Sequence, residues 1–133
     1  MLLLTNDEPQ TVAVGQAVQL DEVLFQSRKG CECHRRNLGA AAIKCSGIYE
    51  IQFSANIGGA AAGAVTLAIQ AGGVTLPETT MISTSAAADQ LNDVATSTVI
   101  RVCCADNSRI SIVNVGNVGM TVANPKLLIK RVG

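Results

Sequence analysis

The sequence predicts an all-β protein, an antiparallel β-sandwich of the jelly-roll kind with about eight strands. Three observations lead to this prediction. Alternating and β-branched apolar runs recur at short spacing, turn residues separate them, and no segment has a convincing helical period. Numerous short strands joined by turns are typical of sandwiches rather than of folds with crossover helices.

The first half of the chain contains the clearest alternation. Residues 48–57 place apolar side chains at every second position, as a half-buried strand requires. Val65–Ile69 repeats this pattern, and Gly72-Gly73 then offers a tight reversal. Three earlier runs are also expected to be strands: Val12–Val14, Val18–Gln26 and Leu38–Cys45.

The second half contains two β-branched runs and a long final strand. Residues 105–108 separate Thr96–Cys104 from Arg109–Val115, and their turn-forming composition predicts a hairpin connection. A turn is expected at Gly116–Gly119. The last strand, Met120–Val132, is expected to be interrupted at Asn124-Pro125, since proline cannot donate a ladder hydrogen bond.

Two segments are expected to be surface loops that contact partners. Ser85–Val94 surrounds its alanines with serine, asparagine and aspartate, which favour loops. Gly58–Ala64 is rich in glycine, but it lacks the Gly-Lys-Ser/Thr ending of a phosphate-binding loop and leads into a strand. Loops of this kind commonly carry binding residues.

Length and charge set the domain organisation and the class of partner. We expect one jelly-roll domain over residues 18–133, with residues 1–17 as an N-terminal arm or first edge strand. The ten basic and ten acidic residues cancel, so no nucleic-acid or membrane partner is predicted. No apolar run reaches the roughly 18–20 residues of a membrane span, and no secretory signal is visible at the start.

The balance of apolar and charged residues points to self-association. Hydrophobic residues make up 48% of the chain and charged residues only 15%, whereas soluble domains carry about 25% charged residues. Some apolar surface is therefore expected to meet another chain.

Six segments resemble, in order, the C-terminal domains of bacterial collagen-like surface proteins, exosporium glycoproteins among them, and related phage virion proteins. These domains share the jelly roll of complement C1q and tumour necrosis factor (TNF). The order of the segments carries the resemblance, which covers roughly residues 18–132. The matching segments are residues 47–57, 62–69, 76–81, 99–104, 110–116 and 122–127.

The resemblance implies a homotrimer, and the expected function is structural. We expect a module of a phage virion, either a capsid decoration protein or a short head fibre or spike, made in the bacterial cytoplasm. Its partner would be a capsid or other particle surface, or else a glycan or host-surface receptor. Since no Gly-X-Y repeat precedes the domain, a free-standing module is favoured. The alternative within the same class is a binding module on a bacterial cell or spore surface.

The basic loop, residues 28–36, is the candidate contact with a partner. Its Arg28, Lys29, His34, Arg35 and Arg36 could bind a phosphate, a capsid surface or an acidic glycan. A basic stretch is more often a solvated surface, and this is the alternative interpretation of the loop.

The same loop contains the candidate metal ligands Cys31, Cys33 and His34. Two to four residues usually separate the paired cysteines of structural zinc sites, whereas only one residue separates Cys31 from Cys33. No metal and no other cofactor is therefore predicted. With no export signal, the five cysteines are expected to be mostly reduced, with Cys45 packed as a small hydrophobe in the sandwich.

The third functional alternative is a cysteine- or zinc-dependent enzyme, and the sequence gives it little support. His34 is the only histidine and is adjacent to Cys33, so on a strand the two side chains would point to opposite faces. No nucleophile elbow, dinucleotide fingerprint or aspartate-rich calcium loop is present. We therefore predict no catalytic residues and no enzyme activity.

Overall fold

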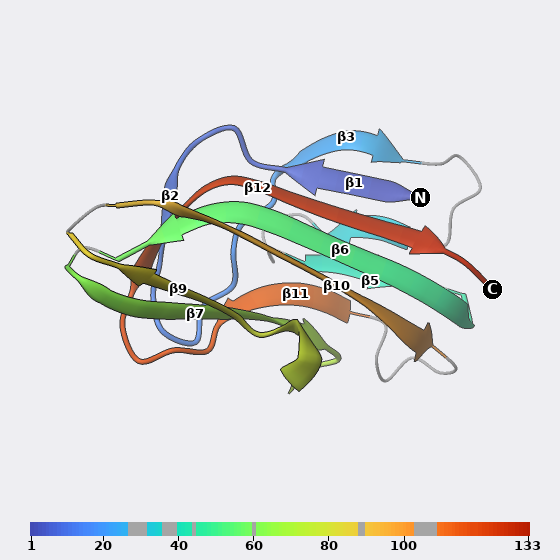
Figure 1. Ribbon diagram of the computed structural model, residues 1–133. Helices are drawn as coiled ribbons and strands as arrows, with labels where there is room; N and C mark the ends of the chain where they lie inside the picture. The colour runs from blue at the N-terminus through green and yellow to red at the C-terminus, as the bar shows by residue number, and fades with distance from the viewer. Residues whose placement is uncertain (27–31, 36–39, 44, 60, 88–89, 103–108) are drawn as a thin grey trace.

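The described residues form two antiparallel sheets packed face to face, as the sequence predicts (Figure 1). The computed structural model describes residues 1–26, 32–35, 40–43, 45–59, 61–87, 90–102 and 109–133, with the backbone alone given for residues 32–35 and 40. We name the sheets by a central strand of each, the β6 sheet and the β11 sheet.

The β6 sheet has the strand order β10-β6-β12-β1-β3, with β2 also paired to β12. Its strands are β1 (Leu2–Thr5), β2 (Gln10–Val12), β3 (Glu22–Gln26), β6 (Gly47–Gly58), β10 (Asn92–Val102) and β12 (Met120–Arg131).

The β11 sheet has the order β4-β5-β11-β7-β8, with β9 also paired to β7. Its strands are β4 (Glu32–Arg35), β5 (Ala40–Ile43), β7 (Gly63–Ala71), β8 (Val74–Thr75), β9 (Met81–Ser85) and β11 (Arg109–Asn114). One short 3-10 helix, η1 (Pro77–Thr79), follows β8.

The core lies between the sheets and follows the two-residue period of the strands. In β6 the alternate residues Tyr49, Ile51, Phe53, Ala55 and Ile57 are buried, as predicted for this run. The facing strands supply aliphatic side chains, and each large one contributes about 1.5–3 kcal/mol on burial. Fully buried residues from the other strands include Leu2, Leu4, Leu67, Ile69, Ile110, Ile112, Leu127 and Ile129.

The N-terminal strand is an inner strand of the β6 sheet, where the sequence led us to expect an arm or an edge strand. β1 lies between β12 and β3, with Leu2 opposite Ile129 and Gln26. The chain then crosses to the β11 sheet, where Val18 donates its backbone NH to the Ile112 carbonyl at 2.8 Å.

The hairpin predicted at residues 105–108 is wrong. β10 belongs to the β6 sheet and β11 to the β11 sheet, so the chain passes from one sheet to the other instead of reversing within one. Turn-forming residues suit both kinds of connection, which is why composition did not distinguish them. The loop predicted at Ser85–Val94 is shorter than expected, because β9 ends at Ser85 and β10 begins at Asn92.

Two local predictions are confirmed. Gly72 and Gly73 both have positive φ, at 61° and 83°, and reverse the chain between β7 and β8. The β12 ladder shifts register between Ala123 and Lys126, around Asn124 with φ of 53° and the proline after it.

Candidate assembly surface

All of the site residues predicted from the sequence lie outside the described side chains. Arg28, Lys29, Cys31 and Arg36 are not described, and Cys33, His34 and Arg35 are described only as backbone of β4. Residues 32–35 of the predicted basic loop are therefore a strand, paired with β5. The partner contact therefore stays a prediction. Among the side chains that the structure does describe, no cluster of three His, Cys, Asp or Glu residues has the geometry of a metal site.

Cys45 is disulfide-bonded, which corrects the expectation that this thiol is a reduced core residue. The partner sulfur belongs to a residue outside the described side chains. Cys45 lies between β5 and β6, and its carbonyl accepts a hydrogen bond of 2.8 Å from the Tyr49 hydroxyl. Covalent and hydrogen-bonded links thus both hold the connection between the two sheets at this point.

The outer face of the β6 sheet combines strands from both halves of the chain. Cross-strand register places its side chains in rows across the sheet. The middle row contains Ser97 of β10, Gln52 of β6, Leu128 of β12, Leu3 of β1 and Phe25 of β3. The row is polar at β10 and β6 and apolar from β12 to β3. Its apolar part is therefore the part that water solvates least well.

A groove of about 490 Å³ runs over this face. Its lining combines small side chains on β10 with partly buried leucines on β12 and β1. The groove exists because the small side chains do not fill the space beside the leucines. The lining residues are Leu3, Gln52, Phe53, Ser54, Ala95, Thr96, Ser97, Lys126 and Leu128.

The groove continues toward the bulge in β12. A second hollow of about 400 Å³ shares Ser54, Ala95 and Lys126 with the first and reaches Asp93 and Asn124. The Thr5 hydroxyl donates to the Pro125 carbonyl at 2.6 Å, which ties the bulge to β1. The bulge is therefore a fixed part of the outer face.

One ion pair borders the groove. The Lys130 ammonium lies 3.4 Å from Glu50 Oε2, and the Gln52 amide donates to Glu50 Oε1 at 2.5 Å. The hydrogen bond from Gln52, and after it the charge of Lys130, lowers the pKa of Glu50. This partly exposed carboxylate therefore stays ionised at neutral pH, and its partners Gln52 and Lys130 lie on the same face of the sheet.

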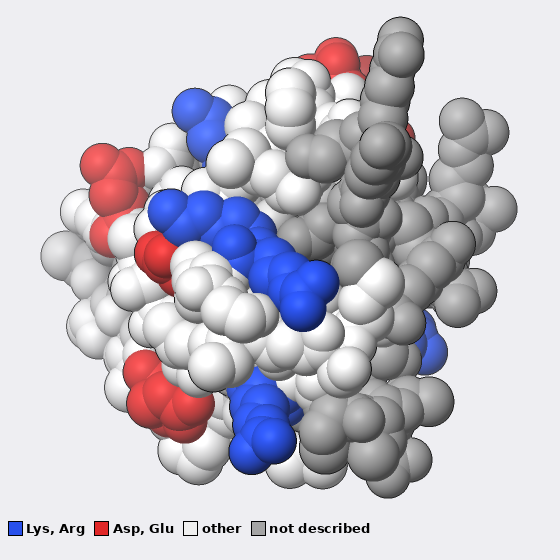
Figure 2. All heavy atoms as spheres, turned by 90° about the vertical axis from the view of Figure 1, so that its right-hand side faces the viewer, with Lys and Arg blue, Asp and Glu red and all other residues white. Residues whose placement is uncertain are grey.

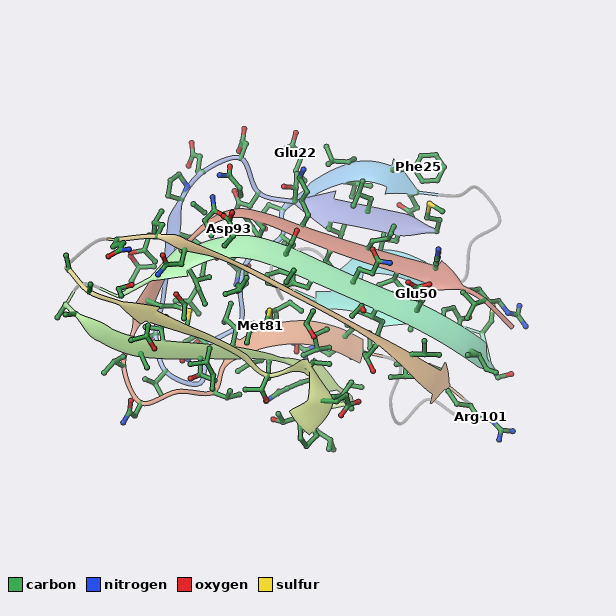
Figure 3. The ribbon with its side chains drawn as sticks, in the orientation of Figure 1. Glu22, Phe25, Glu50, Met81, Asp93 and Arg101 are labelled. Carbon is green, nitrogen blue, oxygen red and sulfur yellow. The ribbon has the colours of Figure 1, made fainter. Side chains whose placement is uncertain are left out.

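Both edges of the β6 sheet expose large apolar side chains. Val99 of β10 is 58% exposed on the outer face. At the other edge, all five residues of β3 are exposed, including Val23, Leu24 and Phe25, and Figure 3 shows Phe25 pointing away from the sandwich. Among the described strands, β3 has no neighbour on its outer side, and an open edge with consecutive apolar residues is able to pair with another chain.

The two ends of the sandwich present different side chains. Figure 2 looks onto the end that carries both termini and shows Lys and Arg side chains across the middle of that face. β10 and β12 run toward this end, where Arg101 and Arg131 are exposed. At the opposite end, the hollow between residues 59–65 and 117–121 has no charged lining residue among those described.

Comparison with solved structures identifies the fold. The globular domain of zebrafish complement 1qA matches with a TM-score of 0.68 at 14% identity, over 96% of this chain and 94% of that one. Eiger TNF from S. frugiperda matches with a TM-score of 0.77 at 8% identity, over 100% and 92%. The PRD1 vertex protein P5 matches with a TM-score of 0.60 at 13% identity, over 99% and 96%.

These likenesses show that the chain has the C1q/TNF-like jelly-roll fold, as the resemblance in the sequence implied. No protein-family model and no curated protein matches the sequence. Within the described part of the chain, no helix is long and apolar enough to cross a membrane.

Proposed function

We propose that this chain is a structural module that trimerises through the outer face of its β6 sheet and decorates a phage particle as a capsid decoration protein, short fibre or spike. The observation that carries the proposal is the outer face itself, with a groove in its centre and exposed apolar residues at both edges. The C1q/TNF-like fold and the PRD1 vertex protein among its structural neighbours support it.

The shape of the face favours a ring over a two-fold dimer. The groove lies near the middle of the sheet, while Val99 projects beside it on β10 and Phe25 projects at the β3 edge. A contact between the groove of one copy and the edge of the next joins different surfaces, so it is heterologous, and a rotation of one third of a turn between neighbours closes it into a trimer. In a ring of three copies, Leu3 and Leu128 of the middle row and the exposed Val99 would all be buried in the contacts between copies.

A matched pair of valine variants tests this arrangement. Val99 on the outer face and Val74 on β8 of the other sheet are 58% and 67% exposed, so arginine fits at either position without disturbing the core. We expect Val99→Arg to weaken trimer association at least about a hundredfold, because the long charged side chain, placed opposite Glu50, would lose its hydration in the interface. Val74→Arg should leave the trimer intact.

Molar mass measured by light scattering over a range of concentrations gives the readout for both variants. Equal dissociation of the two variants, or an intact Val99→Arg trimer, would place the interface elsewhere. Circular dichroism of each variant checks that its strands are retained.

The particle assignment is tested by co-sedimentation of the full chain with assembled phage particles. We propose that the basic loop makes this contact, so Arg28→Glu with Lys29→Glu should abolish co-sedimentation while the trimer persists. Arg109→Glu with Arg131→Glu is the control, since it makes the same change in charge outside the loop and away from the outer face of the β6 sheet. Binding that is lost equally in both double variants would show a general electrostatic attraction, and no binding of the wild type would contradict the particle role.

A further inference from the structure

The end of the sandwich opposite the termini contains a second kind of hollow, which shares no lining residue with the groove. Its volume is about 620 Å³, within the range of about 300–1,000 Å³ typical of small-molecule sites. It lies between the β6–β7 connection and the turn before β12, at the left of Figure 1. The lining residues are Thr11, Gly59, Ala61, Ala62, Gly63, Ala64, Val65, Asn117, Val118, Gly119, Met120 and Thr121.

The floor of this hollow is buried and its rim is exposed. Val65 and Met120 are 2% and 1% exposed, whereas Ala62, Ala64 and Val118 on the rim are open to solvent. An occupant would therefore meet side chains that already belong to the core, and it would cover the apolar atoms of the rim. Such burial is favourable in proportion to the apolar area removed from water.

Hydrogen bonds fix one wall of the hollow before any ligand arrives. Asn114 is 1% exposed and donates to the carbonyls of Val12 and Val118 at 3.1 and 2.9 Å. Its side-chain oxygen accepts from the Gly116 NH at 3.0 Å. This one amide holds β2 and the 116–119 turn together, so little conformational entropy remains to be lost there on binding.

The opposite wall is constrained by close backbone packing. A Cβ on Gly58 would lie 2.1 Å from the Gln90 carbonyl oxygen, so only glycine permits the observed approach of the two segments. Val115 donates its NH to the Thr66 carbonyl at 3.1 Å and joins the 116–119 turn to β7. The hollow is therefore bounded by elements whose spacing is set by the fold.

The chemistry of the lining restricts the class of ligand. None of its twelve described lining residues is charged, so an ion, a phosphate or a charged peptide would lose its hydration without a compensating partner. None is aromatic, which leaves no ring for a sugar or a nucleobase to stack on. The polar side chains are two threonines and one asparagine, which can bind a single neutral head group.

We propose that this hollow binds an uncharged molecule with one aliphatic chain and a hydroxyl or amide head group. The chain would lie against Val65, Met120 and Val118, and the head group would remain near Thr11, Asn117 and Thr121. None of these residues lines the groove on the β6 sheet, so the proposal does not depend on the trimer or on the particle role.

A homologous series of primary alkanols, from hexanol to decanol, tests the site on the full-length protein. Methyl NMR spectra should show saturable shifts of Met120, Val65 and Val118, with affinity rising about fourfold for each added methylene. Absence of saturable shifts, or shifts confined to residues of the outer face such as Leu3 and Leu128, would overturn the proposal.

Two pairs of alanine variants locate the ligand. Ala64 lines the hollow and Ala87 does not, although both are exposed. Ala64→Phe should fill the space and abolish decanol binding, whereas Ala87→Phe should retain it. Should Ala64→Phe fail to fold, Ala62→Asp places a charge on the rim and should weaken binding at least about tenfold, against Ala87→Asp as control. Equal binding by the two members of a pair would contradict the site.

Discussion

At the scale of single residues, the least expected feature is the disulfide at Cys45. We predict that reduction lowers the free energy of unfolding by about 2–4 kcal/mol, because the reduced unfolded chain regains the conformational freedom that the cross-link removes. Urea unfolding with and without reductant measures the change, and Cys45→Ser should make stability insensitive to reductant. Rapid alkylation of Cys45 in the native, unreduced protein would contradict the bond.

Glu50 supplies a pH-dependent prediction at the same scale. Its pKa is lowered in the folded protein, so its interactions stabilise the fold above the ordinary glutamate pKa and are lost as pH falls through the lower folded value. Gln52→Ala and Lys130→Ala should each raise the pKa of Glu50, because the hydrogen bond from Gln52 and the charge and hydrogen bond of Lys130 all lower it. NMR titration of the Glu50 carboxyl carbon measures both shifts, and an unchanged pKa in either variant would contradict this assignment.

At the scale of elements, Gly58 determines how closely the end of β6 approaches Gln90. Gly58→Ala should destabilise the protein by about 1–3 kcal/mol, because its Cβ would lie 2.1 Å from a backbone oxygen. Gly119→Ala is the control, since a Cβ there would make only an ordinary contact of 3.7 Å with Val12. Thermal or urea unfolding compares the two, and equal effects would show that the close approach relaxes at little cost.

The strands that could be predicted are those whose burial alternates. β6 shows the two-residue period in its sequence because its buried positions are apolar and its outer ones polar. β9 does not, because two of its buried positions are Ser83 and Ser85, whose polarity conceals the inward face. In β1 three consecutive leucines conceal the period, since Leu3 of the outer face is as apolar as the buried Leu2 and Leu4.

The candidate surfaces were harder to predict than the strands. The outer face combines β10, β12, β1 and β3, which are far apart in the sequence and become neighbours only through the sheet order. The exposed run in β3 was a possible signal, because Val23, Leu24 and Phe25 are consecutive apolar residues in a strand without alternation. Composition predicted that an apolar surface exists, but its location follows from topology.

At the scale of the whole molecule, the three surfaces have separate chemical characters. The side of the β6 sheet is grooved and bordered by apolar edges, one end carries basic side chains and both termini, and the other end contains an uncharged hollow. A trimer formed through the side would leave both ends free. The same arrangement would allow the basic end and the hollow to act independently of assembly.

The central claim is that the outer face of the β6 sheet is an interface between copies of this chain. Light scattering after size exclusion, on the wild-type protein at micromolar concentration, tests it most directly. We predict a single species with three times the chain mass of 13.7 kDa. A single species with the mass of one chain would contradict the claim.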